Sequence, residues 1–257
     1  MERVLAHHDG LLVGIDRNIT AGRLNAVGIT TTDYGTSQSV TWAHGEIRDP
    51  WRRPYRRSEN TVLTVEHVMA SAALPLIFPA VKLANGWHGD GGIRLTAPLS
   101  PALHLGANRI LAISNRHGRS LEQAELPMIT NYPPPAQVIG ALMNAIFLDM
   151  LDYDATTMKR YNDLIATMPT HTAPYRHVDV LILRPSQDLG RLARQFESRL
   201  PSLFRFLTRG FGTTETESPD ALSLLMFQSD YVTALLELGQ ADARARRREI
   251  QAFLGTE

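Results

Sequence analysis

Residues 70–113 read ASAALPLIFPAVKLANGWHGDGGIRLTAPLSPALHLGANRILAI, and this stretch decides how the chain is interpreted. Near its centre, His88-Gly89-Asp90-Gly91-Gly92 sets one acidic side chain among three glycines, with apolar segments on both sides. Glycine lets the backbone turn sharply and lets another group approach closely. A carboxylate on such a turn can be a base, a metal ligand or a turn residue that accepts backbone N–H groups.

Segments typical of strands and helices alternate on both sides of this stretch. Apolar and β-branched runs predict strands, and apolar residues at helical spacing predict helices. The predicted strands are 23–32, 37–43, 109–114 and 177–183, with a hairpin of 81–84 and 87–88 around Asn85-Gly86. The predicted helices are 10–22, 64–73 and 98–105. A strand, a crossover helix and a strand in succession predict an α/β fold with a mostly parallel central sheet and flanking helices.

The C-terminal part of the chain is predicted to be helical. A long helical stretch follows Pro133-Pro134-Pro135 and runs to Ile165. Beyond Arg184-Pro185 the predicted helices are 189–200, 202–208, 219–227, 231–238 and 242–254, with boundaries at Ser218-Pro219 and Gly239. We therefore predict a core domain over residues 1–185 and a helical C-terminal layer over 186–257.

Composition excludes several classes of protein. The 257 residues carry 26 Lys+Arg and 26 Asp+Glu, so net charge gives no reason to expect a nucleic-acid partner. Cysteine is absent, which excludes disulfides, thiolate catalysis and cysteine zinc sites. No apolar run reaches the roughly 20 residues of a membrane span, and the N-terminus MERVLAHHDG lacks a signal-peptide apolar core. We expect a cytoplasmic protein with at most peripheral membrane contact.

Motifs for cofactors and metals are missing. The chain contains no G-x-G-x-x-G, no G-x-x-x-x-G-K-[ST] and no H-E-x-x-H. His7-His8-Asp9 and His88-x-Asp90 could ligate a metal, but neither has a matching partner cluster, and we expect no metal and no cofactor. Ser71 lies in a predicted helix without a glycine-flanked elbow, which favours close packing over a nucleophile. A substrate contact by His117, in a loop after a strand, has no support from its neighbours.

One basic cluster stands out in the first half of the chain. Residues 51–57 read WRRPYRR, with aromatic residues between the arginines. A solvated loop is the favoured interpretation, because short charge runs usually occupy one. The alternative is a patch for phosphate head groups or an anionic surface.

The block from Ala70 to Ile113 resembles the C-terminal part of the catalytic domain of patatin-like phospholipases. The resemblance is carried by Ala70-Ser71, Leu74-Pro75, Phe78-Pro79, Asp90-Gly91-Gly92, Pro98-Leu99 and Gly106-Ala107. Residues 29–42 (ITTTDYGTSQSVTW) and 222–243 are similar to other parts of bacterial members. The resemblance implies a three-layer α/β fold and a lipid acyl hydrolase that uses a serine–aspartate dyad on a lipid or acyl ester substrate.

The resemblance implies that Asp90 is the dyad base, with Gly91 and Gly92 as the motif glycines beside it. The family's nucleophile lies in a G-x-S-x-G elbow, and none occurs here; the nearest string is Gly35-Thr36-Ser37-Gln38-Ser39. A glycine-rich oxyanion loop is also missing. We therefore expect an N-terminally truncated domain that is inactive alone, with the nucleophile on an upstream fragment. The alternatives are a non-catalytic pseudoenzyme that binds lipid or a partner, and one half of a split hydrolase.

Overall fold

The computed structural model describes residues 10–47, 50–75, 77–84, 86–118, 149–168, 176–199 and 226–255, together with isolated residues 122, 125, 132, 138, 141, 142, 145 and 223. The chain divides into two compact units. Unit 1 comprises residues 1–110 and 150–180, and unit 2 comprises 111–149 and 181–257. The sequence-based boundary between residues 185 and 186 stays a prediction.

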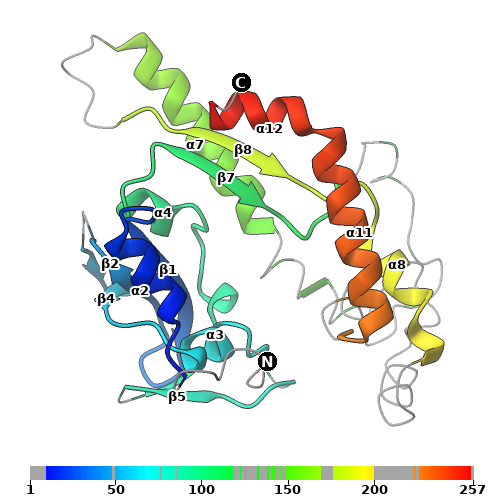
Figure 1. The fold of residues 1–257 in the computed structure, drawn as a ribbon, viewed down its shortest axis with the longest axis horizontal. Helices are drawn as coiled ribbons and strands as arrows, with labels where there is room; N and C mark the ends of the chain where they lie inside the picture. Colours follow the sequence, from blue (N-terminus) through cyan, green and yellow to red (C-terminus); the bar gives the residue numbers. More distant parts are fainter. Residues whose placement is uncertain are drawn as a thin grey trace. The chain divides into compact units, whose positions relative to one another are not determined.

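Unit 1 is built on a six-stranded sheet in the order β3-β4-β2-β1-β6-β5 (Figure 1). Its strands are β1 (Ala26–Asp33), β2 (Gln38–Gly45), β3 (Arg52–Arg53), β4 (Arg56–Asn60), β5 (Val81–Leu83) and β6 (Gly86–Asp90). The α/β class, with helices beside a sheet, is confirmed.

The sheet of unit 1 is mixed rather than mostly parallel. Only β2 and β4 pair in parallel, and the other four pairings are antiparallel. The reason lies in the connections, because β1–β2, β3–β4 and β5–β6 are joined by turns too short for a parallel crossover. A second sheet contains β7 (Arg109–Ile113) and β8 (Asp179–Leu183), whose arrows run the same way in Figure 1. The parallel pair expected from the succession of strand 87–88, helix 98–105 and strand 109–114 does not form, because β6 and β7 lie in different sheets.

Two hairpins with short turns lie next to the acidic motif. Between β1 and β2, Oδ1 of Asp33 accepts the backbone N–H groups of Gly35 and Thr36, at 2.9 and 3.3 Å. This aspartate turn fixes the register over all eight residue pairs. In the β5–β6 hairpin, Leu83 pairs with Gly86, so Gly86 already belongs to β6 rather than to the turn.

The basic cluster forms a hairpin and not a loop. Arg52 and Arg53 form β3, and Arg56 and Arg57 begin β4, at one edge of the sheet. The prediction of a solvated loop is therefore wrong. The run of charged residues gave no indication that β4 would pair with β2.

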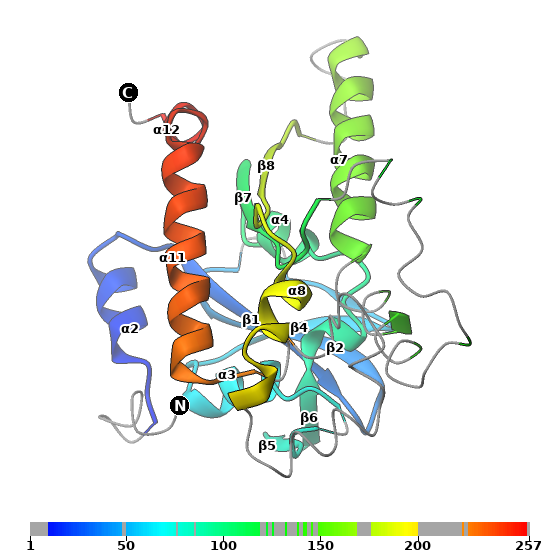
Figure 2. The same cartoon turned by 90° about the vertical axis from the view of Figure 1, so that its right-hand side faces the viewer.

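The helices of unit 1 are α2 (Val13–Thr20), α3 (Val65–Ser71), α4 (Ser100–His104) and all but the first residue of α7 (Asp149–Thr167), with one 3₁₀ turn, η1 (Gly91–Ile93). Helix α3 lies against β1, β5 and β6 (Figure 2). A capping box between Thr64 and His67 begins it, at the first residue of the predicted helix 64–73. The core between helices and sheet is apolar and contains Val40, Trp42, Leu63, Ala70 and Leu83.

Unit 2 contains α8 (Leu189–Arg194), the 3₁₀ turn η2 (Glu197–Arg199), α11 (Ser229–Ala245) and α12 (Arg247–Leu254). Ala193, Met226 and Tyr231 form its buried cluster, and burial raises the pKa of Tyr231 to about 12. Helix α11 continues through Gly239, so the predicted helix boundary there is wrong. The chain bends at Arg246 instead, where α12 begins (Figure 1).

Several predictions fall on residues outside the described ranges. These are the helix 202–208, most of 219–227, the triple proline and part of the helical stretch that follows it, whose later part is confirmed as α7. Among the described helices, none is long and apolar enough to cross a membrane.

Candidate functional site

Asp90 is the last residue of β6, at the point where the strand passes into η1. Its backbone N–H donates to the carbonyl of Ala73 at 3.0 Å, and its carbonyl accepts the hydroxyl of Thr32 at 2.7 Å. Its side-chain Oδ1 accepts the N–H of Gly92 at 2.7 Å. Within the described residues, Oδ2 has no hydrogen-bond partner. Among these residues, Oδ1 of the carboxylate is therefore fixed by a hydrogen bond, whereas Oδ2 is unpaired.

Asp90 ends a strand that is antiparallel to both of its neighbours, since β6 runs antiparallel to β1 and to β5. The carboxylate is nevertheless positioned, because Thr31 pairs with Asp90 across the sheet and Gly92 fixes the side chain from the following turn.

The glycines around Asp90 are required by close neighbours. A Cβ atom on Gly91 would overlap the backbone carbonyl of Thr30, and one on Gly89 would overlap the phenol of Tyr34. Backbone cannot move aside easily, whereas the end of a half-exposed tyrosine can. The sequence indicated close approach at these glycines, and the structure identifies what approaches them.

Burial gives this carboxyl unusual proton affinity. It raises the pKa of Asp90, and the hydrogen bond from Gly92 lowers it only in part. The phenol of Tyr34 has a raised pKa as well, first because of burial and then because of the charge of Asp90. Tyr34 is therefore within electrostatic reach of the carboxylate, from the side of Gly89.

A buried polar network lies behind the site. The indole N–H of Trp42 donates to Oγ1 of Thr31 at 2.8 Å, and that hydroxyl contacts Nδ1 of His88 at 3.0 Å. Thr31 and His88 are at most 1% exposed. Burial lowers the pKa of His88, although the charge of Asp33 opposes this effect. Sequence reasoning missed the role of Thr31, and the run of three threonines in β1 gave no signal of which one is buried.

The other sequence candidates have structural partners. Ser71 donates its hydroxyl to the carbonyl of Thr30 at 2.8 Å, which ties α3 to β1 as the packing interpretation requires. His117 donates its Nδ1–H to the carbonyl of Pro185 at 2.9 Å. His7, His8 and Asp9 lie outside the described residues. Across the described part of the chain, no three His, Asp or Glu side chains gather as metal ligands.

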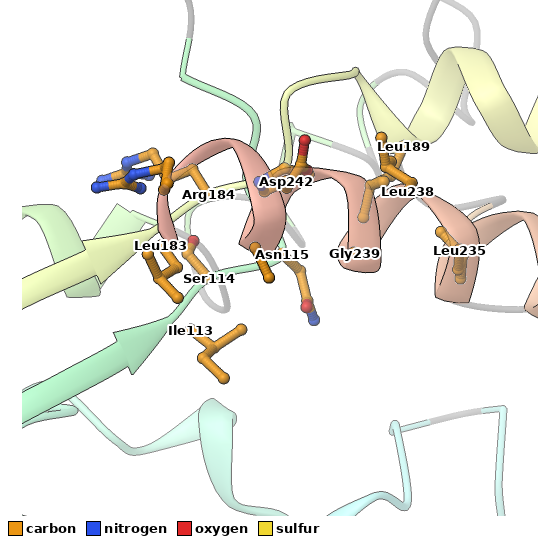
Figure 3. A pocket seen from close by; sticks show the side chains of 13 residues that line it. Ile113, Ser114, Asn115, Leu183, Arg184, Leu189, Leu235, Leu238, Gly239 and Asp242 are labelled. Atoms are coloured by element: carbon orange, nitrogen blue, oxygen red, sulfur yellow. The ribbon is translucent and has the colours of Figure 1, made fainter. Parts of the chain in front are cut away.

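Unit 2 holds a cavity of about 390 Å³ that sequence reasoning did not identify (Figure 3). The chain following β7, the end of β8 and the chain after it, α8 and α11 surround it with mostly apolar side chains. Its lining consists of Ile113, Ser114, Asn115, Leu183, Arg184, Pro185, Leu189, Leu235, Leu238, Gly239, Asp242, Ala243 and Arg246. The carboxyl ends of parallel strands are a frequent place for such a crevice. The sequence signal available for this cavity was the pair of predicted buried strands 109–114 and 177–183, each followed by a polar residue.

Polar groups at this cavity are partly engaged by the backbone. Oδ2 of Asp242 accepts the N–H of Ser186 at 2.9 Å, and the guanidinium of Arg246 donates to the carbonyl of Ile182 at 3.0 Å. Burial lowers the pKa of Arg184 and the charge of Arg116 adds to this effect. The cavity therefore combines leucine side chains with a cationic group, a pairing suited to an amphiphile.

Comparison with known proteins identifies one region of the chain. Residues 27–103 match the family described as patatin-like phospholipase. No curated protein and no solved structure matches the chain. The matched region runs from β1 into α4 and includes Asp90, Gly91 and Gly92, so the resemblance seen in the sequence is confirmed over it. Over residues 27–103 the chain is therefore similar to patatin-like phospholipases.

Proposed function

We propose that this chain carries the base of a lipid acyl hydrolase, and that Asp90 is that base. The observation that supports the proposal is the state of the carboxylate. One oxygen is fixed by Gly92, the other has no partner among the described residues, and burial raises the pKa. A buried, oriented carboxylate with raised proton affinity suits general-base catalysis near neutral pH. The substrate is a lipid or acyl ester, met in the cytoplasm or at a membrane surface.

The proposed reaction proceeds in two balanced steps. A serine oxygen attacks the ester carbonyl carbon while its proton passes to Asp90, and the departing alcohol takes that proton as the acyl–serine bond forms. Water then attacks the acyl–serine carbonyl and gives a proton to Asp90. The serine oxygen leaves with that proton as the fatty acid is released. No cofactor or metal takes part in either step.

No G-x-S-x-G elbow occurs in the sequence, so the proposal assigns the serine to a separate segment. Ser71 does not replace it, because its hydroxyl is committed to the carbonyl of Thr30. We therefore propose that this chain is inactive alone and that a separate segment with the elbow completes the dyad.

The test is reconstitution with a separate patatin-like segment that carries a G-x-S-x-G elbow, in one chain or as two co-expressed chains. Hydrolysis of a p-nitrophenyl ester and of a phospholipid is measured. Asp90→Asn should lower kcat by about 100- to 10,000-fold. The exposed Asp163→Asn on α7 makes the same chemical change and should leave the rate unchanged. A reconstituted activity that survives Asp90→Asn would refute the role of Asp90.

The alternative is a non-catalytic protein that binds lipid or a partner, and the cavity in unit 2 favours it. A fatty acid would place its chain among the leucines and its carboxylate near Arg184. Calorimetric titration with dodecanoate tests this directly. Leu238→Gln, in the cavity wall, should abolish binding, whereas Leu236→Gln on the same helix, where the side chain is 62% exposed, should not. Saturable binding without ester hydrolysis in any reconstitution would favour the alternative.

A further inference from the structure

We propose that the β3–β4 hairpin and Arg94 form a docking surface for a membrane that contains anionic lipids. We call the exposed side chains of Arg52, Arg53, Tyr55 and Arg94 the arginine patch. The proposal deepens the proposed lipid acyl hydrolase function by naming the surface that meets the lipid. It is testable without turnover, since binding to vesicles needs no nucleophile.

The pairing of the hairpin is unfavourable in isolation. Arg52 lies directly opposite Arg57, and Arg53 lies directly opposite Arg56. Like charges directly opposite each other on antiparallel strands destabilise the pair. Arg53 indeed contributes to the lowered pKa of Arg56, after burial. A ligand of opposite charge would relieve this repulsion.

The inner arginines have partners inside the protein. Arg57 pairs with Glu59 at 3.0 Å and with Asp33 at 3.4 Å. Arg56 donates to the hydroxyl of Ser100 at 3.4 Å and is influenced by the charge of Asp154. Among the described residues, Arg52 and Arg53 have no acidic partner. Within the described part of the chain, the positive charge on the outer strand is therefore uncompensated.

An aromatic side chain completes the patch. Tyr55 is 71% exposed at the hairpin turn, and the guanidinium of Arg94 lies 5.6 Å from its ring centroid. Tyrosine with an apolar ring and a polar hydroxyl suits the membrane–water interface. Arg94 directly follows η1, four residues after Asp90, so the patch includes a residue that adjoins the turn after the proposed base.

The hairpin is held rigidly enough to serve as a preformed surface. Trp51 at its base is 8% exposed and stacks on His104 with ring centroids 4.3 Å apart. The side chain of Gln38 donates to the carbonyl of Pro54 at 3.0 Å, and the N–H of Ser58 donates to the carbonyl of Trp51 at 2.9 Å. Docking would therefore cost little ordering entropy.

The test is cosedimentation of the full chain with phosphatidylcholine vesicles, with and without phosphatidylglycerol. We expect binding only to the anionic vesicles, reversed by high salt. Replacing three arginines (Arg52→Gln, Arg53→Gln, Arg94→Gln) should weaken binding by about 100-fold. Replacing three other exposed arginines of unit 1 (Arg17→Gln, Arg23→Gln, Arg160→Gln) removes the same charge and should have a much smaller effect.

Stability gives a second readout. Because the replacements remove cross-strand repulsion, the Arg52→Gln, Arg53→Gln variant should unfold at the same temperature as wild type or higher while it binds vesicles less tightly. Equal binding to neutral and anionic vesicles, or unchanged binding by the triple variant, would overturn the proposal. Tighter binding to duplex DNA than to anionic vesicles would overturn it too. Asp90→Asn should bind vesicles as wild type does, so a failure here is distinct from a failure of the dyad proposal.

Discussion

The backbone N–H of Gly92 donates to Oδ1 of Asp90 at 2.7 Å, and this bond holds a buried carboxylate at the turn after β6. Burial raises the pKa of Asp90 above its ordinary value of 3.8. The folded protein therefore binds this proton more tightly than the unfolded chain does. The resulting stabilisation is complete below the unfolded pKa and is lost as the pH rises through the folded pKa.

We predict that Asp90→Asn raises the unfolding temperature at neutral pH. Asparagine keeps an Oδ1 that can accept the N–H of Gly92, but it removes the buried charge. The gain over wild type should shrink as the pH falls through the raised pKa of the folded state, because the wild-type carboxyl then becomes protonated. Thermal unfolding from pH 4 to 8 measures this difference, with Asp163→Asn as the exposed control. A gain that does not depend on pH would show that the charge is not its cause.

The two glycines beside Asp90 should differ in their tolerance of alanine. Gly91→Ala forces a Cβ onto the backbone carbonyl of Thr30 and should cost about 3 kcal/mol. Gly89→Ala meets the end of Tyr34, which can swing outward, and should cost about 1 kcal/mol. Urea unfolding gives both values. Adding Tyr34→Ala should relieve the second cost and leave the first unchanged, and any other pattern would contradict this account of the glycines.

Thr31 should be the most sensitive threonine of β1. Thr31→Val leaves the indole N–H of Trp42 and Nδ1 of His88 without their partner, both in the protein interior. We expect a loss of about 2 to 4 kcal/mol in the free energy of unfolding. Thr30→Val removes one bond to Thr41 at a half-buried position and should cost about 1 kcal/mol. Equal costs in urea unfolding would argue against the buried network.

Gly239 should be replaceable without loss of the helix. A Cβ there meets no atom within 4 Å, and α11 is continuous through the position. Gly239→Ala should therefore stabilise the protein by about 0.5 to 1 kcal/mol, because alanine loses less entropy in a helix. Gly14→Ala, in α2 and equally open, is the matched control and should gain a similar amount. Destabilisation by Gly239→Ala alone would mean that the cavity wall needs the glycine.

Local sequence determined several elements near the site. Asp33 sets the β1–β2 turn through local contacts, because its carboxylate accepts the backbone N–H groups of Gly35 and Thr36. The predicted helix 64–73 begins at Thr64, where a threonine oxygen can satisfy the first turn. The glycines around Asp90 indicated close approach and, with the surrounding block, the family of residues 27–103. Each of these inferences depends on neighbours within a few positions.

Tertiary structure decided what distant segments bring together. The contact between Thr31 and His88 joins residues 57 positions apart, and the requirement for Gly91 comes from the carbonyl of Thr30 on another strand. The basic cluster forms a hairpin because β4 pairs with β2, and no local sequence pattern predicts that pairing. The sequence by itself determined the turns, the caps and the acidic motif, because local hydrogen bonds and backbone sterics set them. The direction of β6 and the environment of Asp90 depend on pairing and burial, which only the assembled sheet supplies.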